Sequence, residues 1–414
     1  KLFSAIFHIL KDNTSLELIM TSYQLLIELD KHFPRMKFSQ SNSEPSSSKT
    51  TELLVVEEDW SPFSLGPVSC YNEREASHKN SGILLDSSDF FQLTQKIAQR
   101  FDEVNCQVPG LKLVGDMMLF QYLVNVLEQD FVSRNTGYKE TESWSLIRES
   151  FLNMLLGSRS INYKGVMKDW VSILSKEFYH PNGVIINNLE NAKQSSGDTV
   201  QHYDVALGIS YLEMKKKTYM AMQKFFSLIM ELDIIKKQAD TQGQTSRADG
   251  GRTPLLEIIL DELTCDEDLF SQFLQVFSDP KWKLEMIVQY FSKYLTKPSV
   301  RTRRSSNSTE VETLDDILSC FASDTNTRSI IKKTGTDVAQ LLLAHAFQAH
   351  LKLEHHNEHR ADSSKDTEGS SFVQICRNVI SGFQNLRRVD KHMEILPIGK
   401  EALFTAATII SMKS

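Results

Sequence analysis

The residues that could bind a metal ion form a run of five histidines in the last quarter of the chain. Two of them, His355 and His359, are four residues apart and would share one face of a helix. Neutral imidazole is a common zinc ligand. The run leads into a polar segment, however, and no cysteine lies close to it in the sequence. We therefore predict no metal site and no cofactor, and we interpret all five as ordinary surface histidines: His345, His350, His355, His356 and His359.

A second group with possible chemistry is a cluster of carboxylates between residues 261 and 268. Paired carboxylates can act as general acid and base or hold magnesium. Three of them fall where a helix should begin, and the positive end of the helix dipole stabilises negative charge there. The other two fall on a polar helix face. We predict structural roles for all five, which are Asp261, Glu262, Asp266, Glu267 and Asp268.

The motifs that mark common enzyme classes do not occur in the sequence. It has no GxxxxGK[ST] loop, no strand followed by GxGxxG, no HExxH and no GxSxG. Each of those chemistries needs its residues at that spacing to place backbone N–H groups, metal ligands or a strained nucleophile. We predict a protein that is not an enzyme, with no catalytic residue and no small-molecule substrate.

One short basic segment stands out from the solvated charges of the chain. Arg301, Arg303 and Arg304 follow an expected helix end and precede Ser305 in a polar loop. Guanidinium groups bind carboxylates and phosphates strongly, so this segment could contact an acidic partner or DNA phosphates, or serve as a nuclear import signal. Phosphorylation of Ser305 would weaken the contact by adding negative charge.

A tryptophan adds a second candidate for the same surface. Trp282 is expected in the first turn of a helix that starts at Pro280. Its large apolar area favours burial against a neighbouring helix, whereas an exposed position would make it an interface anchor. Together with the turn at Arg252 and the arginine segment, Trp282 defines the surface that we expect to contact a partner or nucleic acid.

Composition narrows the function classes. The chain has 414 residues, 41% of them apolar, and carries 53 acidic against 46 basic residues, a formal charge of −7. Sequence-wide wrapping of nucleic acid is disfavoured, because phosphate binding draws on lysine and arginine. Five widely separated cysteines indicate neither a disulfide framework nor a zinc cage, and they favour a reducing compartment, the cytosol or nucleus. No apolar run approaches the roughly 20 residues that span a bilayer, so we expect no membrane contact.

The elements that must position these residues are helices. Apolar residues recur at spacings of three and four through most of the chain, as at Leu284, Ile287 and Phe291, and alternating strand-like stretches are short and scarce. Side chains that can cap a helix stand at the expected starts. These are Thr14 with Glu17, Thr264 with Glu267, Thr313 with Asp316, Thr253 before Pro254, and Asp279 before Pro280.

Helix pairs joined by polar loops predict an all-α protein. We expect an irregular HEAT- or armadillo-like helical stack, an α-solenoid, forming a single extended domain over residues 1–414. A compact multi-helix bundle is the alternative. The segments rich in small polar residues read as flexible loops. They cover residues 37–51, 67–88, 191–199, 238–251, 300–312 and 354–370.

Three long segments carry a resemblance to a known family. Glu142–Arg159, Thr245–Arg304 and Arg388–Ile410 resemble, in the same order, the plant negative regulators of systemic acquired resistance. That resemblance implies a nuclear, non-enzymatic helical protein similar to the Nse-six subunit of the SMC five-six complex.

In that role the protein would pair with an Nse-five-like subunit, bind the SMC five-six core, act in DNA damage response, repair and recombination, and restrain defence-gene expression. Any DNA contact would be weak or indirect. The alternative is a transcriptional co-repressor scaffold independent of the SMC complex.

Overall fold

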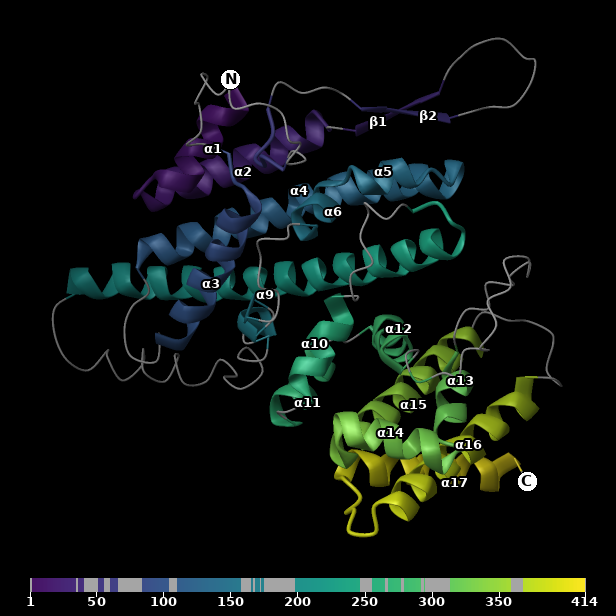
Figure 1. Cartoon of the computed structure of the whole chain (residues 1–414). Coiled ribbons are helices and arrows are strands. Elements are labelled where there is room, and N and C mark those ends of the chain that lie inside the picture. The colour runs from purple at the N-terminus through teal and green to yellow at the C-terminus, as the bar shows by residue number, and fades with distance from the viewer. Residues whose placement is uncertain are drawn as a thin grey trace, which may run out of the picture. The chain divides into compact units, whose positions relative to one another are not determined.

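The computed structural model confirms an all-α helical stack (Figure 1). The contacts divide the chain into two compact units, Lys1–Arg252 and Thr253–Ser414, whereas the sequence led us to expect one extended domain over 1–414. Among the residues described, no helix is long and apolar enough to cross a membrane. The structure describes residues 2–34, 36–40, 51–55, 60–65, 84–103, 110–157, 165–166, 168–171, 173–174, 198–245, 255–264, 267–276, 279–291, 294, 313–358 and 368–413.

The first unit consists of helices and one pair of short strands. The strands pair antiparallel, with Met36 opposite Val55. The elements are α1 (Leu2–Asp12), α2 (Leu16–His32), β1 (Met36–Gln40), β2 (Thr51–Val55), α3 (Ser87–Glu103), α4 (Leu111–Thr141), α5 (Trp144–Arg148), α6 (Phe151–Leu156) and α9 (Asp198–Thr241).

Helix α4 is the centre of the first unit. It packs along α9 and also contacts α1, α2 and α3, and Figure 1 shows it between α2 and the long α9. Most of its residues between Leu113 and Leu127 are buried. Because its apolar residues are distributed over every face, the helix cannot lie at a surface and is enclosed by its neighbours.

An aromatic cluster joins α3 to α9 through a short segment of the chain. Trp170 has no exposed surface, and its ring centroid lies 4.9 Å from that of Phe225 in an edge-to-face arrangement and 5.6 Å from that of Phe91. Its indole Nε1 donates a hydrogen bond of 3.0 Å to Thr94 Oγ1. The indole ring is therefore packed against other aromatic rings, and its single N–H donor has a hydrogen-bond partner, as burial of a tryptophan requires.

A buried ion pair links α4 to the helices that follow it. Arg134 Nε lies 2.9 Å from Asp130 Oδ1, and the two side chains are 9% and 3% exposed. Arg134 Nη1 donates to the carbonyl of Leu146 at 3.2 Å, and Asp130 Oδ2 accepts from the backbone N–H of Phe151 at 2.8 Å. The pair thus supplies partners for the backbone of α5 and for the start of α6.

The second unit surrounds a second central helix. Residues 338–347 of α15 are all buried, and α15 contacts α11, α12, α13, α14, α16 and α17. The helices of this unit are α10 (Leu255–Leu263), α11 (Glu267–Val276), α12 (Pro280–Phe291), α13 (Leu314–Cys320), α14 (Asp324–Thr334), α15 (Thr336–Glu358), α16 (Glu368–Val389) and α17 (Pro397–Lys413).

Gln340 on α15 fixes the turn between α16 and α17. Its fully buried amide donates from Nε2 to the carbonyl of Glu394 at 3.0 Å and accepts at Oε1 from the N–H of Leu396 at 3.2 Å. Nearby, a Cβ on Gly399 would lie only 3.0 Å from Phe383 Cε1. The start of α17 therefore approaches α16 at a distance that a larger side chain would disturb.

Two of the predicted helix starts are confirmed. Thr313 and Asp316 form a reciprocal capping box at α13, and α12 begins at Pro280 with Asp279 Oδ1 accepting from Lys281 N. The prediction at Thr14 was wrong by one residue, because the N-cap of α2 is Ser15.

The other two predicted starts are not seen as helix caps. Thr264 follows the end of α10, where its hydroxyl donates to the carbonyl of Asp261, and Thr253 lies outside the described residues.

The predicted loops begin later or end earlier than the sequence indicated. Strands include 37–40 and 51, and helices include 87–88, 198–199, 238–241, 354–358 and 368–370. Polar residues at these positions extend the helices and strands, since a helix end can keep such side chains in solvent. Leu85 also forms a bridge with Phe63. Residues 41–50, 67–83, 191–197, 246–251, 300–312 and 359–367 lie outside the described residues.

Candidate interaction surface

The predicted interaction surface is described at only one of its residues. Arg252, Arg301, Arg303, Arg304 and Ser305 lie outside the described part of the chain. Trp282 lies in the first turn of α12, as the sequence predicted. The structure therefore locates Trp282 and leaves the arginine contact as a prediction.

Trp282 is half-buried, between the core position and the exposed anchor position that the sequence left open. The exposed Lys281 places its Nζ 5.9 Å from the centroid of the indole ring. A cation near the face of an indole is attracted by the ring's quadrupole. The head of α12 therefore presents an aromatic face and a lysine together, a combination suited to contact with a protein.

The acidic cluster joins helices within the second unit. Asp261 on α10 accepts a hydrogen bond of 3.0 Å from the hydroxyl of Tyr290 on α12, and its Oδ2 lies 3.2 Å from Lys333 Nζ on α14. Burial, with the Asp261 charge as a further cause, raises the pKa of Tyr290. Glu267 opens α11, and Asp266 lies outside the described residues. The arrangement gives Asp261 a structural partner on each of two helices.

The interpretation of His345 as a surface histidine was wrong. This residue is only 4% exposed, because it lies within the enclosed stretch 338–347 of the central helix α15. His350 is half-buried and stacks on Phe372 at a centroid distance of 6.2 Å. The side chains of His355 and His356, and the whole of His359, lie outside the described part. Over the side chains that the structure does describe, no group of three or more potential ligands could hold a metal ion.

Two lysines lie near this buried histidine. Burial, and then repulsion from Lys283 and Lys352, lowers the pKa of His345 to about 3. Burial, and then repulsion from Lys352, lowers the pKa of Lys283 to about 8. Lys283 is half-buried on α12, while Lys352 is exposed on α15. Sequence reasoning missed this cluster, although the position of His345 inside the apolar run LLLAHAF was a signal of its burial.

The neutral, buried His345 should make the second unit sensitive to acid. Its folded pKa of about 3 lies below the usual 6.5, so the unfolded chain binds more protons between these values. Stability should therefore fall as the pH drops through this window, by about 2 kcal/mol at pH 5. Urea unfolding monitored by hydrogen exchange in α15 at pH 7 and pH 5 measures this loss.

The matched variants for this measurement are His345→Leu and His392→Leu. The first removes the buried imidazole and should abolish most of the loss between pH 7 and pH 5. The second removes an exposed imidazole of the same unit and should leave the loss unchanged. If the His345→Leu variant lost as much stability between pH 7 and pH 5 as the parent chain, His345 would not be the cause of the acid sensitivity.

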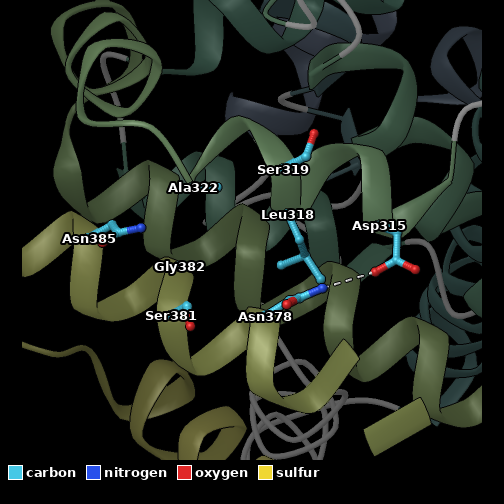
Figure 2. A pocket seen from close by; sticks show the side chains of 8 residues that line it. All are labelled: Asp315, Leu318, Ser319, Ala322, Asn378, Ser381, Gly382 and Asn385. Atoms are coloured by element: carbon cyan, nitrogen blue, oxygen red, sulfur yellow. Dashed lines mark hydrogen bonds between the residues drawn. The ribbon is translucent and has the colours of Figure 1, made fainter. Parts of the chain in front are cut away.

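A groove of mixed polar and apolar lining lies between α13 and α16 (Figure 2). Its volume is about 290 Å³, and small side chains leave it open. Asn378 Nδ2 donates to Asp315 Oδ1 at 3.4 Å across one end. Near the other end, Asn385 Nδ2 donates to the carbonyl of Phe321 at 2.5 Å. Its lining residues are Asp315, Leu318, Ser319, Ala322, Asn378, Ser381, Gly382 and Asn385.

Close packing of α16 explains where the groove lies. A Cβ on Gly382 would be 3.2 Å from Leu343 Cδ2, so α16 approaches the central helix α15 at this glycine. Hydroxyl and amide groups contribute to the lining, among them Ser381 and Asn378, and Figure 2 shows the Asn378 amide directed at Asp315. Such groups can hydrogen-bond an extended segment of a partner. The sequence analysis did not identify this groove, because its two walls are about 60 residues apart in the chain.

Comparison with known proteins covers both units. Residues 35–279 match the family model described as the SNI1 middle domain, and residues 295–414 match the SNI1 C-terminal domain. The chain is similar to the Arabidopsis thaliana protein "Negative regulator of systemic acquired resistance SNI1", with 42% identity over 416 residues. That alignment covers 100% of this chain and 84% of the relative. No solved structure was found to match.

Proposed function

Because this chain belongs to the SNI1 family, we propose that it is a negative regulator of systemic acquired resistance. The observation that carries the proposal is 42% identity along the whole chain to a relative with that name. Similarity over both units, and not over one motif, supports a shared role for the entire helical stack. Restored repression of defence genes, when this chain is expressed in plants that lack their own copy, would support the proposal.

The finer proposal is a non-enzymatic regulatory subunit in the nucleus. The chain would pair with an Nse-five-like subunit and, through it, bind the SMC five-six core in DNA damage response and recombination. Support comes from the family resemblance and from surfaces suited to protein contact, the head of α12 and the groove between α13 and α16. DNA contact in this arrangement is weak or indirect.

Co-expression with the Nse-five-like candidate should yield a stable one-to-one heterodimer. Size-exclusion chromatography with light scattering measures its mass. Charge reversal of Arg301, Arg303 and Arg304 is expected to weaken that association without unfolding the chain, because it replaces attraction for acidic groups by repulsion. The matched control reverses Lys216 and Lys217, two exposed lysines on α9.

The alternative is a co-repressor scaffold that acts without the SMC complex. A chain that stays monomeric beside the Nse-five-like candidate would contradict the subunit proposal. Recovery of transcription factors and of no SMC subunit from nuclei would then favour the co-repressor. If reversing the charges of Lys216 and Lys217 weakened the heterodimer as much as reversing those of the arginine segment, the arginine segment would not be a specific contact.

A further inference from the structure

The groove between α13 and α16 has the length of a short extended peptide. Its lining residues on α16 run from Asn378 to Asn385, two helical turns, which corresponds to about 10 Å at about 1.5 Å per residue. An extended chain rises about 3.3 Å per residue, so the groove matches about three residues. Its volume of about 290 Å³ lies at the lower limit of small-molecule pockets, and it is open to solvent. A short protein segment therefore fits it better than an enclosed small molecule.

One end of the groove carries a negative charge that no described residue neutralises. Asp315 is exposed on α13 and forms no ion pair within the described part of the chain, although the exposed Arg377 precedes Asn378 on α16. Its Oδ1 accepts from Asn378 Nδ2 at 3.4 Å, beyond the usual range of about 2.7–3.2 Å, so this bond is weak. One turn beyond the other end, Arg388 and Asp324 pair and balance each other. The carboxylate of Asp315 is therefore available to a stronger donor.

The middle of the groove is apolar. Leu318 is buried on α13 and lines the groove together with Ala322 and Gly382. Figure 2 shows these three residues between Asp315 at one end and Asn385 at the other. The aliphatic stem of a long basic side chain packs on apolar surface while its charged head reaches a polar group. The floor and the charged end together suit such a side chain.

The far end of the groove offers a neutral acceptor. Asn385 is half-buried on α16, and its Nδ2 donates to the carbonyl of Phe321. Its Oδ1 has no hydrogen bond to any residue that the structure describes. A free amide oxygen accepts a backbone N–H, which every residue of an extended segment except proline can donate. The groove thus presents a carboxylate, an apolar floor and an amide oxygen in that order.

We propose that this groove binds an extended segment of a protein partner through one arginine side chain, whose guanidinium pairs with Asp315. A guanidinium donates two parallel hydrogen bonds to a carboxylate, and its stem covers Leu318. A backbone N–H of the segment reaches Asn385 Oδ1. The Asp315 charge repels phosphates, so the groove disfavours DNA and phosphorylated segments. Partner binding rests on the function proposed above, whereas the charge of the bound side chain follows from the groove.

The probes are blocked pentapeptides with arginine, glutamine or glutamate at the centre of four alanines, added to the full chain. Asparagine labelled with ¹⁵N in its side chain gives amide resonances, and the variants Asn378→Asp and Asn385→Asp identify two of them by their disappearance. Saturable movement of both resonances is expected with the arginine peptide and not with the other two. Added sodium chloride should weaken this binding, because salt screens the contact with Asp315.

Two variants test the proposed contacts, and each has a matched control at an exposed position of α17. Asp315→Asn keeps the shape of the side chain and removes its charge, so the apparent Kd for the arginine peptide should rise about fivefold, as when an exposed ion pair is lost. Glu401→Gln should leave it unchanged. Ala322→Leu narrows the groove and should raise the Kd at least as much, whereas Ala407→Leu should not. All four positions are exposed, so the variants keep the fold.

The proposal is overturned if the arginine peptide moves neither resonance, if the glutamine peptide binds equally well, or if Asp315→Asn leaves the Kd unchanged. Equal binding of N-acetyl-arginine amide and the pentapeptide would overturn the extended segment. Movement with duplex DNA alone would overturn the charge of the ligand. Because the probes need no partner protein, their failure beside an intact heterodimer removes only this site. Peptide binding by a chain that forms no heterodimer would instead support the groove and contradict the identity of the partner.

Discussion

Trp170→Ala is expected to lower the free energy of unfolding of the first unit by about 3–5 kcal/mol. The ring is fully buried between Phe91 and Phe225, so its removal loses apolar burial and leaves a cavity. It also removes the donor that pairs with the buried Thr94 hydroxyl. Native-state hydrogen exchange in α4 measures the change separately from the second unit.

Trp170→Phe is the graded control for this prediction. Phenylalanine keeps most of the aromatic contact and loses the hydrogen bond to Thr94, so we expect a cost of about 1–2 kcal/mol. A cost for Trp170→Ala that does not exceed the cost for Trp170→Phe would show that the ring contributes little. In that case α3 and α9 would be held by their other contacts.

Arg134→Met is expected to destabilise the same unit by about 3–5 kcal/mol, because it removes the cation that pairs with the buried Asp130 carboxylate. The carbonyl of Leu146 loses its donor as well. The measurement is again the free energy of local opening in α4. An exposed pair provides the contrast, since Lys31 and Glu28 lie 2.7 Å apart with both side chains more than half exposed.

Lys31→Met should cost much less than Arg134→Met, because solvent screens an exposed ion pair. The double variant Asp130→Leu with Arg134→Met should cost less than the two single changes added together, since both buried charges of the pair are then absent. A cost for Arg134→Met no greater than that for Lys31→Met would refute the importance of the buried pair.

Helical periodicity was sufficient to predict the fold class, and the reason is visible in α4 and α15. Both helices carry apolar residues on every face, a pattern that only enclosure by other helices can accommodate. Their ends were harder to predict, because polar residues at 238–241 and 354–358 suit a loop and an exposed helix end equally. The division near Arg252 was not predicted, since the polar segment there resembles the other connecting segments.

The candidate site could be predicted only where its signal was local. Trp282 was identified from its neighbours Pro280 and Lys281, which stand beside it in the sequence. The cluster of Lys283, His345 and Lys352 was missed, because its members come from two helices about 60 residues apart and depend on packing that no local pattern reports. The one local clue in the sequence is the position of His345 inside an apolar run.

The enclosed helices also have an evolutionary consequence. When one helix per unit fills the interior, a substitution in α4 or α15 affects many neighbours at once, whereas one on the outward face of a surrounding helix affects few. The outward faces of α12, α13 and α16 can therefore change in sequence while the interior stays nearly fixed. The second unit can in this way vary its surface at little cost to its own folding.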